Sequence, residues 1–381
     1  MKEKHITRLL ALIVLLLVVV SGSGFGGVAA SQTDSDAYAK SLLELKHTLR
    51  FNDDGNFKIV IFADIQDTYP LKEDTVRYMN QILDQEKPDL VLLAGDNHCG
   101  GIGNKSQLKT YLTAMCEPME SRKIPWAQVY GNHVEGGYTF KMGDVGEIGK
   151  AEQQKIFESF KYNISKAGTV YGMGNYVLPI LRSDSDKIAF NVFGLDTHNY
   201  LNEKTGTQQN LYGQKFENAV LVENPIYGTL FDPGGKYETI HADQIRWYWK
   251  SSVALEEYNG SKIAAMMFFH IAQIEWEYIT RNPKQTNMTG QDVEGVWPSE
   301  LSSGLFHACY ERGDVKGMFV GHNHQNDYNG TYMGIQLGFT PTIGSLAYFS
   351  PATRGARVIE VNQDDAFNFT TRMVYCKDLD A

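Results

Sequence analysis

The sequence predicts an α/β fold, because short apolar runs alternate with stretches of helical spacing. Residues 57–64 and 89–96 are two such runs, and each ends in an acidic residue. Near-continuous apolar character is typical of strands that are buried on both faces of a sheet. Residues 74–86, between the two runs, have the apolar spacing of a helix. Together they predict a strand–helix–strand unit with a right-handed crossover.

The same alternation continues along the rest of the chain. Further strands are expected at 125–130, 188–195, 263–269 and 317–320, with short β-rich segments from 332 to 375. Further helices are expected at 105–121 and 243–255, whereas 141–187 and 202–235 have the composition of loops. No Pro/Ser-rich linker divides the chain, so we expect one folded domain over residues 31–381.

The charge balance limits the kinds of partner. The chain of 381 residues has a formal net charge of −10, and no stripe rich in Lys and Arg is present to neutralise nucleic-acid phosphates. We therefore expect no nucleic-acid partner, and a nuclease is disfavoured. A small phosphorylated substrate is compatible with this charge, because bound metal ions supply local positive charge that the count omits.

The N-terminus has the features of a secretory signal peptide. Lys2, Lys4 and Arg8 precede an apolar run at 9–20, and Val28-Ala29-Ala30 forms a cleavage site of small residues. We expect residues 1–30 to be removed and the protein to be secreted or otherwise extracytoplasmic; an uncleaved anchor is the alternative. The apolar run is shorter than the roughly 20 residues of a comfortable membrane span, and no second long run follows.

Two further sequence features suit an exported protein. Four cysteines permit disulfides in three pairings, although buried free thiols are an equal alternative. Asn-x-Ser/Thr sequons, which fit the surface loops of a glycoprotein, lie at Asn104, Asn163, Asn259, Asn287, Asn329 and Asn368.

Metal-type side chains follow five of the predicted strands. They are Asp64, Asp96, Asn132, His270, His322 and His324. Residues beyond the carboxyl ends of strands converge in open α/β sheets. Two metal ions about 3.5–4 Å apart need a bridging carboxylate, several Asp, Asn or His ligands and open positions. Each residue alone could be a cap, a turn or a core histidine, but their joint order favours a metal centre.

These residues stand in blocks that resemble those of the calcineurin-like metallophosphoesterases, which include the purple acid phosphatases. The family pattern is D-x-H, G-D, G-N-H-[DE], a His after a strand, and G-H-x-H. The corresponding blocks here are Asp64-Ile65-Gln66, Gly95-Asp96, Gly131-Asn132-His133, Phe269-His270 and Gly321-His322-Asn323-His324. The resemblance runs from about 57 to about 362. Residues 268–271 and 355–359 also look like the plant and fungal branch named as probable inactive purple acid phosphatases.

The resemblance implies a fold, a cofactor and roles for these residues. The fold would be a sandwich of two mixed β-sheets flanked by helices, and the cofactor two divalent or trivalent ions of Fe, Mn or Zn. Asp96 would bridge both ions, and His133 would contact the phosphate and protonate the leaving group. The remaining ligands would be Asn132, His270 and His322 at the second ion, and Asp64, His324 and Gln66 at the first.

The implied activity is metal-dependent hydrolysis of phosphomonoesters or phosphodiesters. A metal-bound hydroxide would attack phosphorus in line, because metal binding lowers the pKa of water from 15.7 to about 7. The substrate would be a small phosphorylated compound or a phosphoprotein, with nucleotides and lipid headgroups also open.

The chain departs from the family pattern at the first ion. Gln66 stands where the family has a His ligand; the neighbouring Asp67 is an alternative ligand. A neutral amide is a weaker ligand than imidazole, so a second hypothesis is a weakly active or inactive relative that binds a phosphate ligand or a partner protein.

Other positions near the blocks also depart or stay open. Val134 replaces the acid after His133, with Glu135 next to it, and Cys99 replaces the ligating Tyr of purple acid phosphatases. We therefore expect no purple colour. His98 and His198 lie near strand ends and could line the pocket, but we expect them to be core histidines.

Overall fold

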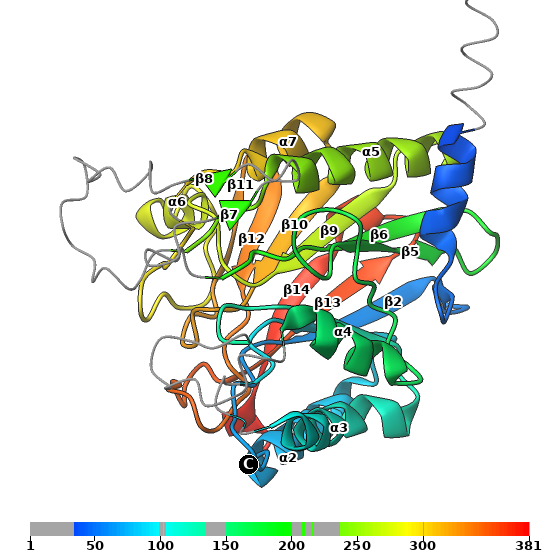
Figure 1. The fold of residues 1–381 in the computed structure, drawn as a ribbon. Helices are drawn as coiled ribbons and strands as arrows, with labels where there is room; N and C mark the ends of the chain where they lie inside the picture. Colours follow the sequence, from blue (N-terminus) through cyan, green and yellow to red (C-terminus); the bar gives the residue numbers. More distant parts are fainter. Residues whose placement is uncertain are drawn as a thin grey trace, which may run out of the picture.

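The computed structural model describes residues 34–98, 102, 104–134, 149–199, 208–209, 215–216, 237–299 and 301–380 (Figure 1). The predicted signal peptide, Cys99 and Glu135 lie outside these residues. Within them, no helix combines the length and apolar character that a membrane crossing requires.

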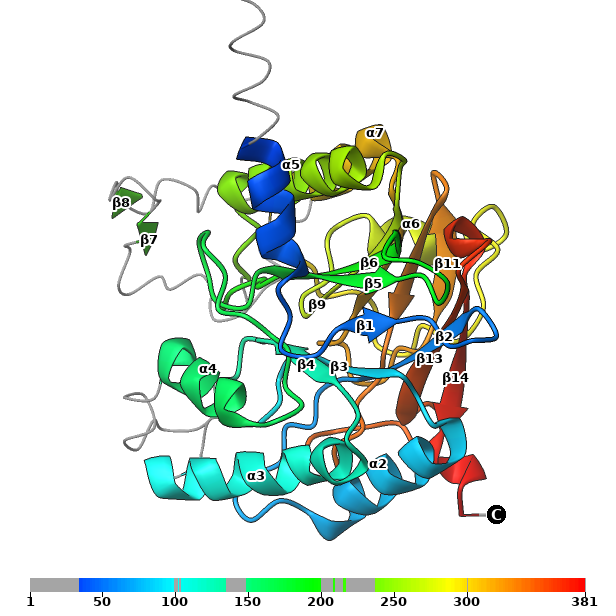
Figure 2. The ribbon, with the colours of Figure 1, turned by 90° about the vertical axis from the view of Figure 1, so that its right-hand side faces the viewer.

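Two mixed β-sheets form the centre of the molecule, as the family resemblance implied (Figures 1 and 2). The five-stranded sheet has the order β14 (Thr370–Tyr375), β13 (Gly355–Asn362), β2 (Asn56–Phe62), β3 (Leu90–Ala94) and β4 (Trp126–Val129). The seven-stranded sheet has the order β1 (Leu49–Arg50), β5 (Tyr176–Leu181), β6 (Ile188–Gly194), β9 (Ala264–Phe269), β10 (Val315–Val320), β12 (Ile335–Phe339) and β11 (Asn329–Tyr332).

Helices cover the outer faces of both sheets. Those beside the five-stranded sheet are α2 (Glu73–Glu86), α3 (Lys105–Arg122) and α4 (Lys150–Ser159). Those beside the seven-stranded sheet are α5 (Ala242–Asn259), α6 (Trp276–Arg281) and α7 (Leu305–Arg312). A further helical stretch spans 34–43, and a short hairpin pairs β7 (Gln208–Gln209) with β8 (Lys215–Phe216).

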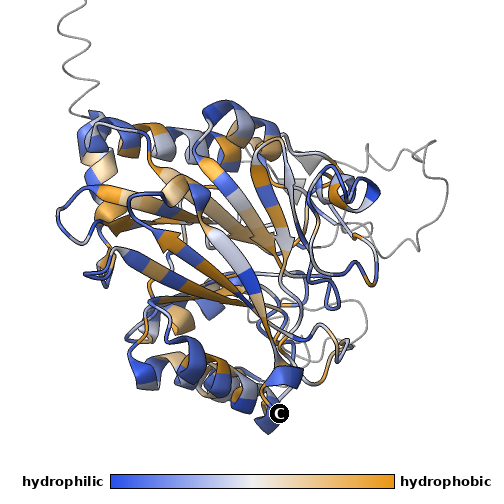
Figure 3. Ribbon diagram, turned by 180° about the vertical axis from the view of Figure 1, so that it is seen from behind, coloured by the Kyte–Doolittle hydropathy of each residue, from blue (hydrophilic) through white to orange (hydrophobic). Residues whose placement is uncertain are grey.

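Strand β2 shows why the apolar runs are continuous. Its Ile59 and Ile61 belong to the core between the sheets, whereas Val60 and Phe62 belong to the core beneath α2 and α3. Successive side chains of a strand point to opposite faces, so a strand covered on both faces must be apolar throughout. Figure 3 shows the apolar strands inside and hydrophilic residues on the outer helices.

Most predicted elements are confirmed, with one correction. β2 and β3 are parallel and joined through α2, as the strand–helix–strand prediction required. The predicted loop at 141–187 is wrong in part, because it contains α4 and β5. The periodic signal of α4 is weak, since polar Gln153 and Gln154 occupy buried positions on its inner face.

The described cysteines and sequons refine the expectations for an exported protein. Cys116, Cys309 and Cys376 are buried free thiols, so the free-thiol alternative holds for these three. Asn104, Asn287 and Asn368 are exposed. The expectation of a surface position is wrong for Asn163 and Asn259, because both side chains are buried and hydrogen-bonded within the core.

Arg357 of β13 links the two sheets. Its guanidinium is buried and donates to the carbonyl of Phe339, at the end of β12, at 2.6 and 3.0 Å, and to that of Asp327 at 2.7 Å. Burial lowers the pKa of Arg357 to about 10, which leaves it charged at neutral pH. The charge is therefore matched by carbonyl oxygens of β12 and of the loop before β11.

Replacing Arg357 by Met should lower the free energy of unfolding by about 2–4 kcal/mol, because it leaves buried carbonyls without donors. Chemical denaturation measures this. Arg281→Met on α6 is the control: Arg281 is 60% exposed and pairs with Glu277 four residues earlier, so its loss should change stability by less than about 1 kcal/mol. Equal stability of the two variants would contradict the link between the sheets.

Candidate metal centre

The predicted site residues converge where the two sheets meet. Loops after β2, β3 and β4 of one sheet carry Asp64, Gln66, Asp96, Asn132 and His133, and loops after β9 and β10 of the other carry His270, His322 and His324. All the predicted metal ligands are buried, whereas His133 is partly exposed. Residues up to 260 positions apart in sequence are thus brought together, which the strand-end prediction anticipated.

Asp96 lies in the middle of this group. Its Oδ2 is 3.2 Å from the Gln66 amide nitrogen and 3.1 Å from His270 Nε2, and its Oδ1 accepts the backbone N–H of His133 at 2.9 Å. Gln66 and His270 are the predicted ligands of different ions. One carboxylate oxygen of Asp96 therefore lies close to a predicted ligand of each ion.

Asp64 is the second buried acidic residue of the group, and its carboxyl group contacts three of the histidines. Its Oδ2 accepts the backbone N–H of His322 at 2.9 Å, which turns Oδ1 toward His324 Nε2 at 3.4 Å and His270 Nε2 at 3.8 Å. The His322 ring packs edge-on against His270, with 5.1 Å between the ring centroids. Two carboxylates and three imidazoles thus share one buried volume.

Backbone carbonyls orient two of the imidazoles. His270 Nδ1 lies 2.9 Å from the carbonyl of Ala94, and His324 Nδ1 lies 3.0 Å from that of Tyr348. A carbonyl only accepts, so each Nδ1 carries the proton and each Nε2 is left to face the carboxylates. This arrangement is the usual support of a metal-binding histidine.

The electrostatics of these groups are strongly coupled. Burial alone would raise the pKa of Asp96, but the charges of His270 and His133 hold it well below its ordinary value. Burial alone would lower the pKa of His270, but Asp96 and Asp64 raise it to about 9. Burial and the neighbouring His270 hold the pKa of His322 well below its usual range. The Asp96 carboxylate is therefore ionised, and the imidazole of His270 compensates part of its charge.

Several buried polar atoms of the group have no hydrogen-bond partner. They are Asp64 Oδ1, Asn132 Oδ1 and Nδ2, and His270 Nε2. Buried polar groups are almost always satisfied, so atoms left over on neighbouring side chains indicate a missing ligand. The atoms comprise carboxylate and amide oxygens and an imidazole nitrogen, a donor set that fits Fe, Mn or Zn.

The backbone at this site is strained. Asp64, Gln66, Asp96 and His322 have positive φ angles of 50°, 40°, 44° and 72°. Residues other than glycine rarely adopt this conformation, and it persists only where the surrounding structure enforces it. The strain turns four side chains inward at the points where the strands end.

The glycines of the motifs make room for ligands from other blocks. A Cβ at Gly95 would lie 2.4 Å from the His270 ring, one at Gly131 would lie 2.1 Å from Asp96 Oδ1, and one at Gly321 would lie 2.6 Å from Asp64 Oδ2. Each glycine precedes one predicted ligand and borders another. This gives a steric reason for the G-D, G-N-H and G-H spacing.

Asp67 does not reach the centre. Its Oδ1 accepts the backbone N–H groups of Ser345 and Leu346, and its Oδ2 accepts the Thr75 hydroxyl at 2.7 Å. Both oxygens are thus used to hold the loop after β12 against the start of α2. Gln66, rather than Asp67, is the residue whose side chain lies beside Asp96.

Three aromatic residues near the centre remain to be placed: one histidine that the sequence singled out and two tyrosines that it did not. His98 is a buried core histidine, as expected, bonded to Gln153 at 3.0 Å. The rings of Tyr237 and Tyr348 were missed: Tyr237 packs edge-on against His322 at 4.5 Å, and Tyr348 stacks on His324 at 4.3 Å. Neither belongs to a motif, so only their contacts reveal them.

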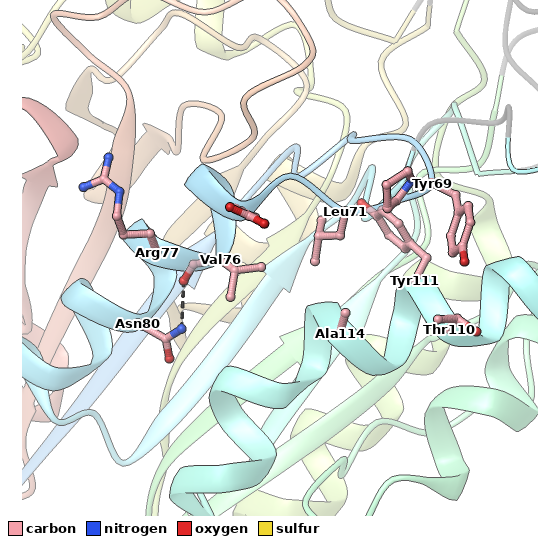
Figure 4. Close-up of a pocket in the computed structure, with 10 residues that line it drawn as sticks. Tyr69, Leu71, Val76, Arg77, Asn80, Thr110, Tyr111 and Ala114 are labelled. Carbon is pink, nitrogen blue, oxygen red and sulfur yellow. Dashed lines mark hydrogen bonds between the residues drawn. The ribbon is translucent and has the colours of Figure 1, made fainter.

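A separate hollow of about 460 Å³ lies between α2 and α3 (Figure 4). Tyr69, Leu71, Val76 and Tyr111 line it, and Asn80 closes one side by donating to the Val76 carbonyl at 2.9 Å. None of the predicted site residues lines this hollow, and it lacks their clustered ligand types. The metal centre is therefore the stronger candidate for function.

The sequence matches the calcineurin-like phosphoesterase family over residues 57–326, a span that includes every predicted site residue. The chain belongs to this family. It is 26% identical over 346 residues to "Probable inactive purple acid phosphatase 14" of Arabidopsis thaliana. The matched region covers 83% of this chain and 77% of that protein. It is 27% identical over 300 residues to "Phosphatase DCR2" of Saccharomyces cerevisiae. That matched region covers 74% of this chain and 46% of the yeast protein.

Among solved structures, a dimetal phosphatase from Danio rerio is similar over 83% of this chain and 95% of its own, with 10% identity and a TM-score of 0.46. At that level nothing about ligands or substrate follows for the present chain. Family membership supports a hydrolase of phosphate esters with a two-metal site in general.

Gly131→Ala should weaken metal binding although it removes no ligand, because the new Cβ has to displace Asp96. A loss of roughly 10- to 100-fold in metal affinity is expected, the scale seen when residues supporting a ligand change. Metal titration of chelator-treated protein measures it. Gly338→Ala is the control, since its Cβ would meet the Phe319 ring at 3.0 Å instead. Equal affinity of both variants would show that Gly131 does not shape the site.

Proposed function

We propose that this protein hydrolyses phosphate esters with two metal ions held by Asp64, Gln66, Asp96, Asn132, His270, His322 and His324. The observation that carries the proposal is the set of buried, unpartnered oxygen and nitrogen atoms around Asp96. Family membership supports the reaction class. Bound ions of this kind supply Lewis acidity and a nucleophile derived from water at neutral pH.

The protein's own residues would prepare this chemistry. The carboxyl groups of Asp96 and Asp64 would hold the ions, and the carbonyls of Ala94 and Tyr348 fix the direction of His270 and His324. Because these groups are already oriented, little reorganisation is needed as charge develops on the phosphoryl oxygens.

His133 is proposed to protonate the leaving group. Its backbone N–H is fixed to Asp96 Oδ1 at 2.9 Å, and its side chain is the one predicted site residue that is partly exposed. It can therefore meet a substrate from the solvent side while its backbone stays anchored to the proposed bridging ligand. A general acid has to lie within hydrogen-bond reach of the departing oxygen.

A second function, phosphate or partner binding without efficient turnover, is favoured by one observation. Gln66 donates its amide N–H to Asp96 Oδ2, the oxygen proposed to bridge the ions. Rotation of the amide would present its oxygen instead, but that oxygen is neutral and binds a metal more weakly than imidazole. The two functions differ in turnover at full metal occupancy.

The main test is hydrolysis of an aryl phosphate by protein loaded separately with Mn, Fe or Zn, alongside elemental analysis. Wild-type protein should turn over, and Asp96→Asn should lose at least about 100-fold in rate, the scale of losing one preorganised electrostatic contact. Asp186→Asn, at a side chain 92% exposed, is the control and should match wild type. Full occupancy by two ions with no turnover for any metal would support the binding function instead.

Gln66→His should tighten binding of the first ion and raise the rate, because imidazole replaces a neutral amide and the donor to Asp96 Oδ2 is removed. Metal titration and steady-state kinetics measure the two effects. Asp67→Asn is the comparison, since Asp67 holds the loop and should alter stability more than metal content. An unchanged stoichiometry and rate in Gln66→His would mean that Gln66 does not limit the first ion.

A further inference from the structure

A second group of metal-type side chains lies apart from the proposed ligand set. His198 follows β6, while Glu238 and His241 precede α5. One ligand atom from each of the three lies within 4.8 Å of the others. His198 and Glu238 are buried, and the side chain of His241 is 18% exposed. The sequence drew attention only to His198, and only as a core histidine.

The protonation of His198 is fixed by its neighbour Gln244. The Gln244 amide nitrogen donates to Asn175 Oδ1 and to the Asp196 carbonyl, both at 2.8 Å, so its Oε1 must accept. That Oε1 lies 2.9 Å from His198 Nε2, which therefore carries the proton. Nδ1 is left with its lone pair. Burial lowers the pKa of His198, which keeps the ring neutral.

His198 is held in place at a conformational cost. Its φ of 68° lies in the left-handed region, and a Cβ at Gly172 would come within 2.7 Å of its ring. The Tyr171 ring lies 4.8 Å from His198 and stacks on His241 at 4.0 Å. A strained residue that is packed on several sides is a candidate for function rather than for stability alone.

Glu238 is a buried acidic residue beside His241. Its Oε1 lies 2.7 Å from His241 Nε2, and the Tyr171 hydroxyl is also hydrogen-bonded to it. Within the described part of the chain, no Lys or Arg forms an ion pair with Glu238. Since burying a carboxylate without compensation is unfavourable, a positive charge at this point would stabilise it.

Asp196 is close but already occupied. Its Oδ1 and Oδ2 lie 2.9 and 3.1 Å from the Lys150 ammonium, and its oxygens also accept the backbone N–H groups of Met173 and His198. At 3.7 Å from His198 Nδ1, it flanks the group without completing it. The available protein ligands are therefore two imidazoles and one carboxylate.

We propose that His198 Nδ1, His241 Nε2 and the Glu238 carboxylate bind one divalent first-row transition metal ion, separate from the proposed two-metal centre. Two imidazoles and a carboxylate with open positions are a donor set that suits zinc and ferrous iron. The ion takes the place of the hydrogen bond between His241 Nε2 and Glu238 Oε1.

The position of this ion gives it a structural consequence for the main centre. Glu238 directly follows Tyr237, whose ring packs against His322, and its backbone N–H donates to the Asn199 carbonyl at 2.9 Å. An ion at this point fixes Glu238 to His198 and thereby holds Tyr237 beside the main centre. The proposal does not depend on hydrolysis at that centre.

Zinc titration of chelator-treated protein tests the proposal, with bound zinc measured by elemental analysis after gel filtration. Glu238→Gln keeps an oxygen that can accept from His241 but removes the charge, so it should bind one zinc fewer per chain than wild type. The same decrease should occur in an Asp96→Asn background, because the two sites are separate. Glu257→Gln, an exposed residue of α5, is the matched control and should bind as much zinc as wild type.

A second readout does not depend on counting ions. Cobalt bound at this site should contribute visible absorption in Asp96→Asn protein that is lost in Asp96→Asn/Glu238→Gln and in Asp96→Asn/His198→Asn. Thermal unfolding in chelator establishes that each variant is folded; His198→Asn replaces Glu238→Gln if the latter is not. Equal zinc content and equal cobalt absorption in the folded variants and their parents would overturn the proposal.

Discussion

The buried carboxylate of Asp96 is the interaction on which the site depends. It lies between loops of both sheets, accepts the backbone N–H of His133, and is within 3.2 Å of Gln66 and 3.1 Å of His270. A charge in such a place is tolerated only when opposite charge and hydrogen bonds compensate it. The positive φ at Asp96 and the space left by Gly131 are both consequences of holding it there.

The strands around the site bring its polar residues to one buried place. The strands that carry the site are buried on both faces. The polar side chains of the site follow directly after these strands end. Arg357 joins the sheets through the Phe339 carbonyl at the end of β12. Four residues with positive φ and four unpartnered polar atoms lie where the strands of the two sheets end.

The sequence predicted much of the fold and of the convergence, because strand ends are visible as apolar runs that stop at Asp64, Asp96 or His270. It could not predict α4, whose buried face carries glutamines, nor the contacts of Tyr237 and Tyr348, which depend on loops from distant parts of the chain. From the sequence alone, Asp67 was an alternative metal ligand. Its hydrogen bonds to Thr75, Ser345 and Leu346 show that it holds a loop instead. The partnership of His198 with Glu238 and His241 likewise requires three-dimensional proximity.

Anomalous diffraction from crystals of the metal-loaded protein tests the central claim most directly. We predict two peaks about 3.5–4 Å apart, with Asp96 between them, one beside Asp64 and His324 and the other beside Asn132 and His270. The proposed third ion would give a separate peak beside Glu238. A fully loaded crystal with no peak within coordination distance of Asp96 would contradict the account.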